Sequence, residues 1–123
     1  IYFTAAGLFD ILAENTFGKR QDKDSDVFEH IYDCDLLIID DLGTELPNSF
    51  TVSQLFICLN ERILRQKSTI ISTNLALEDI KSIYSERTFS RISSNYTILR
   101  ITGDDIRIQK KLLNLGGTND VTP

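Results

Sequence analysis

The sequence predicts an α/β domain in which helices flank a parallel β-sheet. Residues 36–39, "LLII", form an aliphatic run without polar alternation, which is typical of a strand buried on both faces. Residues 68–74, "STIISTN", form a second run rich in β-branched side chains. Between the two runs, residues 52–63 repeat apolar side chains at helical spacing. Strand-like and helix-like segments that alternate in this way indicate a parallel sheet with crossover helices.

The segment ahead of the aliphatic run contains a strand, a helix and a polar interruption. The expected elements are a strand at 1–4, a helix at 5–17, a polar stretch at 18–26 and the segment "VFEHIYD" at 27–33, which leads into the aliphatic strand. The helix is predicted because Leu8, Ile11 and Leu12 recur at helical spacing. His30, the only histidine, lies in an amphipathic stretch and is expected to be structural.

The helix at 52–63 has the clearest pattern of the chain. Its apolar face is formed by residues three or four positions apart, namely Val52, Leu55, Phe56, Leu59 and Ile63. Pro47, Asn48 and Ser49 lie just upstream and are typical start signals.

The carboxyl-terminal part of the chain continues the alternation. Its expected elements are two short helices, a last strand, a small helix and a disordered tail, at residues 77–84, 87–93, 96–102, 103–115 and 116–123. Glu78 and Asp79 lie where carboxylates favour the amino end of a helix. We therefore expect one domain over residues 1–115.

Composition and charge exclude several classes of protein. The 123 residues suffice for one domain, with 41% apolar and 25% charged residues, as in ordinary globular proteins. No apolar run approaches the roughly 18 residues of a membrane span, so we expect no membrane partner. The net charge of −5 argues against nucleic-acid binding over the whole surface. Cys34 and Cys58 lack metal-ligand spacing, which favours a reducing, cytoplasmic location.

Polar groups follow three of the predicted strands. Asp40 and Asp41 end the aliphatic strand, Asn74 ends the second run, and Arg107 lies in the turn after the third. In a parallel sheet these ends meet at one edge, where ligands bind. A carboxylate there can hold Mg²⁺, directly or through water, and a second carboxylate can polarise an attacking water. Arginines further along the chain supply the positive charge that phosphoryl transfer needs.

Four motifs in this order, "LLIIDDLGTE", "STIISTN", "ERTFSRI" and "GDDIR", resemble the AAA+ ATPase domain of DnaC/DnaI-type replicative helicase loaders. The related IstB-type transposition ATPases are the alternative within the same likeness, which covers roughly residues 1–113. The resemblance implies an ATP- and Mg²⁺-dependent protein of DNA replication. It also implies binding to a replicative helicase and to single-stranded DNA, and self-association through the AAA+ interface.

The resemblance implies a role for each candidate residue. Asp40 matches the Walker B carboxylate associated with Mg²⁺, and Asp41 takes the place of the catalytic carboxylate, which is often Glu in AAA+ proteins. Asn74 matches the sensor 1 position and Arg91 the arginine finger. Arg107 matches the sensor 2 arginine, a residue that binds ATP.

The sequence contains no G-x-x-x-x-G-K-[ST] phosphate loop. By the resemblance this loop lies upstream of residues 1–4, so we expect a P-loop NTPase fragment that lacks the first strand and the loop. Such a fragment is expected to be inactive alone, although the complete protein is an ATPase. The family's strand order then leaves 68–73 and 96–102 beside a gap, where they pair directly or admit another chain.

Each candidate residue also has a structural interpretation. The acidic pair can be a turn with Asx hydrogen bonds, and Asn74 can be a helix N-cap. Arg87 and Arg91 lie four residues apart and share a helix face that is solvated in the simpler interpretation. Arg107 can neutralise the aspartates just before it.

A basic feature, "NTFGKR", contains Phe17, Lys19 and Arg20. An aromatic ring beside two cations can stack a base while the cations neutralise phosphates, which is the usual scheme of single-strand binding. The region is similar to the insertion that contacts single-stranded DNA in helicase loaders. The alternative is a solvated loop, because the aspartates at positions 22, 24 and 26 cancel much of the charge.

An alternative from another class is the receiver domain of response regulators. The stretch "DLLIIDDLGTELP" also resembles its phosphorylation strand, with Asp40 as the phosphoacceptor. Receivers need an acidic pair after the first strand, where this chain has "TAAG", and a lysine after the last strand, where it has "TGDD". Both differences argue against this alternative.

Overall fold

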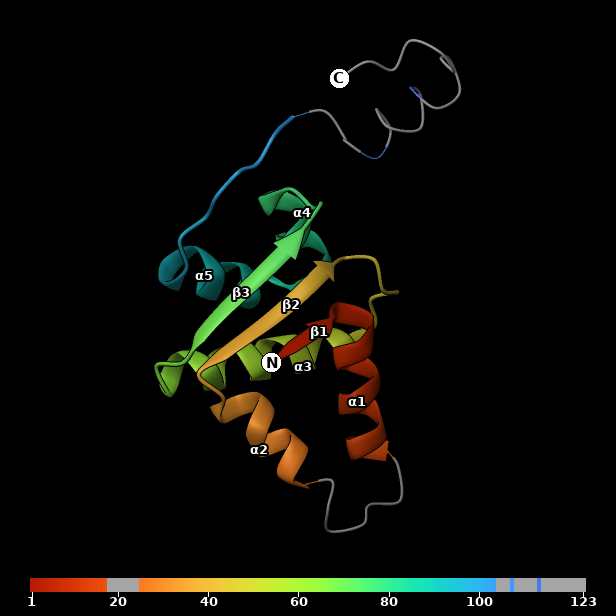
Figure 1. Ribbon diagram of the computed structural model, residues 1–123, viewed down its shortest axis with the longest axis vertical. Helices are drawn as coiled ribbons and strands as arrows, with labels where there is room; N and C mark the ends of the chain where they lie inside the picture. Colours follow the sequence, from red (N-terminus) through yellow and green to blue (C-terminus); the bar gives the residue numbers. More distant parts are fainter. Residues whose placement is uncertain (18–24, 104–106, 108–112, 114–123) are drawn as a thin grey trace.

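The computed structural model describes residues 1–17, 25–103, 107 and 113 (Figure 1). In chain order its elements are β1 (Tyr2–Thr4), α1 (Ala5–Phe17), α2 (Ser25–Asp33), β2 (Leu36–Leu42), α3 (Ser49–Leu64), β3 (Ser68–Thr73), α4 (Leu77–Tyr84) and α5 (Glu86–Asn95). The predicted fold class, an α/β parallel sheet with flanking helices, is confirmed.

The sheet has three parallel strands in the order β1-β2-β3. Thr4, the last residue of β1, is the partner of Asp40 on β2. The pairing of β2 with β3 shifts in register between Ile39 and Leu42, and Leu42 pairs with Thr73. The acidic pair therefore lies within a local irregularity of the sheet, which re-aims side chains at the strand end.

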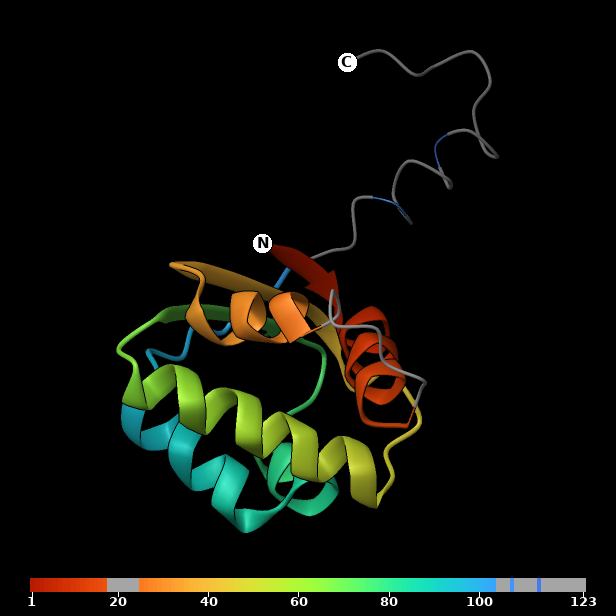
Figure 2. The ribbon, with the colours of Figure 1, turned by 90° about the horizontal axis from the view of Figure 1, so that it is seen from below.

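The helices lie on one side of the sheet (Figure 2). The strand order advances in one direction along the chain, and right-handed crossovers therefore place the connecting helices on the same face. Leu37 and Ile39 face the helices and are fully buried. On the other face, Tyr2, Leu36 and Ile70 are 56%, 39% and 53% exposed. The expectation that β2 is buried on both faces is thus wrong, because no described element covers the second face.

Helix α3 confirms the clearest of the sequence patterns. The side chain of Asn48 accepts the backbone N–H of Thr51 at 2.9 Å, and the Thr51 hydroxyl accepts the backbone N–H of Asn48 at 2.9 Å. This reciprocal pair satisfies two donors at the helix start. Leu55 and Leu59 are fully buried, while Val52 packs against the core from a partly buried position.

One charged side chain of α3 is buried within the apolar core. The Arg62 guanidinium donates to the carbonyls of Ile31 and Ser68, both at 2.7 Å, to the Thr69 hydroxyl at 2.8 Å and to the Cys34 sulfur at 3.4 Å. Its side chain is fully buried. These bonds connect α2, α3 and β3, and they compensate the loss of hydration of the cation.

The two short helices α4 and α5 meet at Ser85, a joint with φ of 128°. The Ser85 hydroxyl accepts the backbone N–H of Thr88 at 3.3 Å and so caps α5. At the start of α4, the Asp79 carboxylate accepts the backbone N–H of Ala76 at 3.4 Å. The expected placement of acidic residues at this helix start is confirmed.

The strand expected at 96–102 is not formed. Its β-branched pattern favours a strand, but β-structure also needs a neighbouring strand to pair with. Among the described residues, β3 pairs with β2 alone, and Ile98, Leu99 and Ile101 are 48%, 80% and 92% exposed. Direct pairing of residues 68–73 with 96–102 is therefore absent from the described chain.

Two further expectations fall wholly or mostly outside the described residues. The tail at 116–123 lies outside them, and of the helix expected at 103–115 only Arg107 and Leu113 are described as helical. Within the described part of the chain, no helix has the length and apolar character needed to cross a membrane.

Candidate functional site

The carboxyl ends of the three strands bring polar groups to one edge of the sheet. Thr4 ends β1, Asp40 and Asp41 are among the last three residues of β2, and Ser72 lies near the end of β3. Parallel strands present such ends on the same side. We call this group, with the turn that follows β2, the acidic edge.

Asp40 is held by hydroxyl groups on both sides. The Tyr2 hydroxyl donates to Oδ2 at 2.5 Å, and the Ser72 hydroxyl donates to Oδ1 in a short hydrogen bond. These two bonds, the one from Ser72 first, hold the pKa of the Asp40 carboxyl below its ordinary value. Hydrogen bonds to the charged form favour ionisation. Asp40 is therefore a fixed anion at neutral pH.

Asp41 adopts a left-handed backbone conformation, with φ of 58°. Its N–H donates to the Ser72 hydroxyl at 3.0 Å, and its carbonyl accepts the Thr44 hydroxyl at 2.8 Å. Aspartate tolerates this conformation better than most residues. The Ser72 hydroxyl thus fixes both acidic residues, and the Asp41 side chain is left exposed.

The turn after Asp41 is closed by a second set of contacts. The Gly43 N–H donates to Oε2 of Glu45 at 3.0 Å, and the hydroxyl of the buried Tyr84 donates to Oε1. Gly43 has φ of 102°, and a Cβ there would lie 2.6 Å from Cδ1 of Leu75. The backbone angle favours glycine at this position, and a side chain would also require Leu75 to move.

Two further candidate residues differ in their surroundings. Asn74 directly follows β3 and is exposed at the acidic edge. Arg91 is exposed on α5, and its guanidinium makes no hydrogen bond or ion pair with any described residue. By contrast, the Arg87 guanidinium lies 4.0 Å from the centre of the Phe56 ring on α3. The two arginines on one helix face therefore have different environments.

The remaining candidates are only partly covered by the structure. Arg107 is described as exposed and helical, but its neighbours lie outside the described residues. Phe17 is the last residue of α1. Lys19 and Arg20 lie outside the described residues, so the expected DNA contact stays a prediction.

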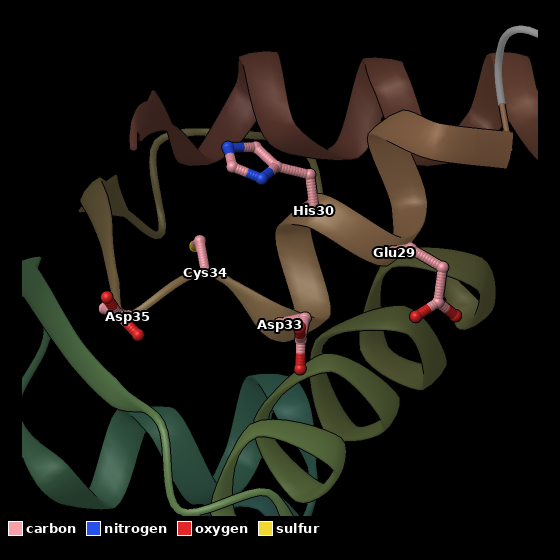
Figure 3. A pocket seen from close by; sticks show the side chains of 5 residues that line it. All are labelled: Glu29, His30, Asp33, Cys34 and Asp35. Carbon is pink, nitrogen blue, oxygen red and sulfur yellow. The ribbon is translucent and has the colours of Figure 1, made fainter.

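A shallow pocket lies at the opposite end of β2 (Figure 3). Its lining residues are Glu29, His30, Asp33, Cys34 and Asp35. Two of its carboxylates, those of Glu29 and Asp33, point toward α3 and pair with Arg65 at 3.2 and 3.6 Å. Within the described residues, no group of three or more potential ligands could hold a metal. The ion pairs of Glu29 and Asp33 with Arg65 join α2 to α3 beside the pocket.

The two cysteines differ in depth, and neither forms a disulfide. Burial raises the pKa of the Cys58 thiol to about 12, which makes it an inert core residue. Cys34 is half-buried, and its sulfur accepts a hydrogen bond from Arg62.

Sequence reasoning missed four residues that belong to the acidic edge or donate hydrogen bonds to it: Tyr2, Ser72, Glu45 and Tyr84. Ser72 lies on β3 two positions before Asn74, which directly follows the strand, so strand periodicity points to it once the site is known. Tyr2 lies two positions before Thr4, the partner of Asp40, and a parallel register is needed to find it. No sequence signal joins Glu45 to Tyr84.

Comparison with known proteins identifies the family of the chain that carries this site. The family model described as "IstB-like ATP binding protein" matches residues 1–114. The chain belongs to the IstB-like ATP-binding family. This membership decides against the receiver-domain alternative.

A solved structure shows a protein to which the IstB-like chain is similar in fold. The crystal structure of the DnaC helicase loader matches it with a TM-score of 0.70 and 25% sequence identity, over 82% of this chain and 60% of the loader. The chain thus spans 60% of the length of that loader. None of the curated protein sequences compared with the chain matches it. The resemblance to the IstB/DnaC group of AAA+ proteins is confirmed.

Proposed function

We propose that the acidic edge of this chain hydrolyses ATP as part of an AAA+ ATPase that loads a replicative helicase onto DNA. The observation that supports it is the acidic edge itself, where Asp40 is held as an anion and the exposed Asp41 lies next to the last residue of the central strand. Membership of an ATP-binding family and likeness to a helicase loader support the proposal.

The residues of the acidic edge fit Mg²⁺ and ATP in part. Each Asp40 oxygen accepts one hydroxyl and keeps a lone pair for a water of hydration, which is how Mg²⁺ is commonly held. Bound Mg²⁺ and ATP supply an activated phosphoryl group and neutralise its charge. The phosphate-binding loop is absent from this sequence, and in the proposal it comes from another part of the full protein.

The other residues act on the water and on the developing charge. The exposed Asp41 carboxylate accepts a proton or a hydrogen bond from the attacking water and orients it. The Asn74 amide lies at the neighbouring strand end and orients the same water. Arg91, unpaired among the described residues, reaches the ATP of an adjacent subunit, and Arg107 binds the phosphates in its own subunit. This division implies self-association of the full protein.

The transposase-helper function is the second candidate, because the matching family model is described as IstB-like. The segment with Phe17, Lys19 and Arg20 would contact single-stranded DNA in either case. The choice is tested by measuring the affinity of the full-length protein for the replicative helicase and for the transposase of its own cell. Binding to the helicase alone supports the loader, and binding to the transposase alone supports the helper.

Hydrolysis itself is tested by Asp41→Asn in the full-length protein. Asparagine favours the left-handed backbone of residue 41, so the turn keeps its shape while the carboxylate is lost. We expect ATP binding to persist and turnover to fall by at least about 100-fold, the usual range for a lost general base. Unchanged turnover in Asp41→Asn would contradict the proposal.

A further inference from the structure

The turn that carries Asp41 is tied to helix α4 through one carboxylate. Glu45 accepts the Gly43 N–H on Oε2 at 3.0 Å and the Tyr84 hydroxyl on Oε1. Tyr84 is fully buried in the core and is the last residue of α4. Both oxygens of Glu45 are thus engaged, one by the turn and one by the core. We call this arrangement the Glu45 clamp.

The turn needs such an anchor because its backbone is unusual at two positions. Asp41 and Gly43 both have positive φ, 58° and 102°. Glycine adopts positive φ readily, whereas a residue with a side chain, such as Asp41, keeps it only where the surroundings determine it. Ser72 and Thr44 hold the Asp41 end of the turn. The Glu45 clamp holds the other end.

Within the part of the chain that the structure describes, no cation competes for Glu45. Among the described residues, its carboxylate takes part in no ion pair within 4.0 Å, since the ion pairs present involve Arg65, Lys67 and Lys81. Burial, followed by the hydrogen bond to Glu45, raises the pKa of the Tyr84 hydroxyl. Tyr84 therefore stays a donor, and the direction of its bond to Glu45 is fixed at every physiological pH.

We propose that Glu45 and Tyr84 are positioning residues that hold the Asp41 carboxylate in its reactive place. This inference rests on the proposed ATPase function. Neither residue touches the reacting atoms. They act by joining the Asp41 turn to the junction of α4 with α5, so that the carboxylate keeps a constant position relative to the sheet edge. Small displacements of such a group are costly, about 100-fold in rate for about 1 Å.

Tyr84→Phe in the full-length protein is the main test. Phenylalanine keeps the ring in the core and removes only the hydroxyl that binds Glu45. We expect kcat for ATP hydrolysis to fall about 10- to 100-fold, with the Kd for ATP and the folded fraction unchanged. Tyr32→Phe is the matched control, because the Tyr32 ring packs against Phe28 on α2 with centroids 6.1 Å apart, and it should keep the wild-type kcat.

Glu45 variants separate geometry from charge. Glu45→Ala should lower kcat as Tyr84→Phe does, whereas Glu45→Gln keeps an acceptor for the Gly43 N–H and should recover most of the rate. Amide hydrogen exchange gives a readout besides activity. Exchange of the Gly43 amide should accelerate in Glu45→Ala and stay slow in Glu45→Gln.

The outcomes distinguish this inference from the function on which it rests. If the wild type hydrolyses ATP, Asp41→Asn abolishes turnover and Tyr84→Phe keeps the wild-type kcat, the positioning role is overturned and the ATPase function stands. A loss in Tyr84→Phe that matches a loss of folded protein also overturns the role. If the wild type does not hydrolyse ATP, the function and the positioning role fall together.

Discussion

Arg91→Ala in the full-length protein should abolish ATP turnover and leave the fold intact. Arg91 is exposed on α5 and its guanidinium has no partner among the described residues. Its removal should therefore change the free energy of unfolding by less than about 0.5 kcal/mol. An engaged arginine finger contributes about a thousandfold to kcat, which corresponds to about 4 kcal/mol of transition-state stabilisation. The Kd for ATP should stay the same, because the finger acts on charge that develops in the transition state.

Arg87→Ala is the control on the same helix face. The Arg87 guanidinium lies 4.0 Å from the centre of the Phe56 ring, and such contacts contribute about 0.5–1 kcal/mol at exposed sites. This variant should lose about that much stability and keep most of its turnover. The two substitutions are thus expected to affect different properties, although both remove one arginine from α5.

The assay combines three measurements on each variant: steady-state ATP hydrolysis, ATP binding by calorimetry, and urea unfolding. Unchanged turnover in Arg91→Ala would refute the assignment. A loss of turnover explained wholly by weaker ATP binding would refute it as well, and Arg91 would then be a solvated residue of the helix face.

Three other variants or fragments give independent tests. Ser72→Ala should raise the pKa of Asp40 toward its ordinary value of 3.8, which NMR titration measures. Because the pKa of Asp40 is lowered in the folded protein, the stabilisation that the hydroxyls give is present above pH 3.8 and is lost as the pH falls through the folded pKa. Arg62→Ala should destabilise the protein by about 3 kcal/mol or more in urea unfolding, because it leaves the carbonyls of Ile31 and Ser68 without their donor and opens a cavity. Residues 1–123 alone should bind ATP more weakly than micromolar in calorimetry, because phosphate affinity comes from loop amides that this sequence lacks.

Strong periodicity explains why most of the fold is predictable. The helix around Leu55 and Leu59 has a complete apolar face and start signals, and the structure contains it at the expected place. The aliphatic run of β2 is an equally clear pattern, but whether each face of the strand is buried depends on which elements pack against it. That is why Leu36 is exposed although its sequence pattern predicts burial.

Other features depend on contacts that periodicity does not encode. Residues 96–102 have the composition of a strand, but no described strand pairs with them. Arg62 occupies a fully buried place on α3 because carbonyls of α2 and β3 accept its hydrogen bonds. A sequence pattern contains neither kind of information.

The acidic pair of the candidate site was predicted from its position at the end of a strand. Its hydrogen-bond partners were missed because they depend on the register between strands. Asp40 and Asp41 end the central strand, so their place at the sheet edge follows from the strand itself. Their partners Tyr2 and Ser72 come from neighbouring strands, and only the parallel register brings them to Asp40. The roles given to Asn74, Arg91 and Arg107 by family likeness stay predictions.

The most direct test of the central claim mixes two inactive variants of the full-length protein. Asp41→Asn subunits keep Arg91, and Arg91→Ala subunits keep Asp41, so an interface between the two kinds of subunit contains one intact site. If the acidic edge is a hydrolysis site completed by an arginine of the next subunit, the mixture should hydrolyse ATP faster than either variant alone. A mixture that never exceeds the rates of the separate variants, under conditions where the subunits exchange, would contradict the account.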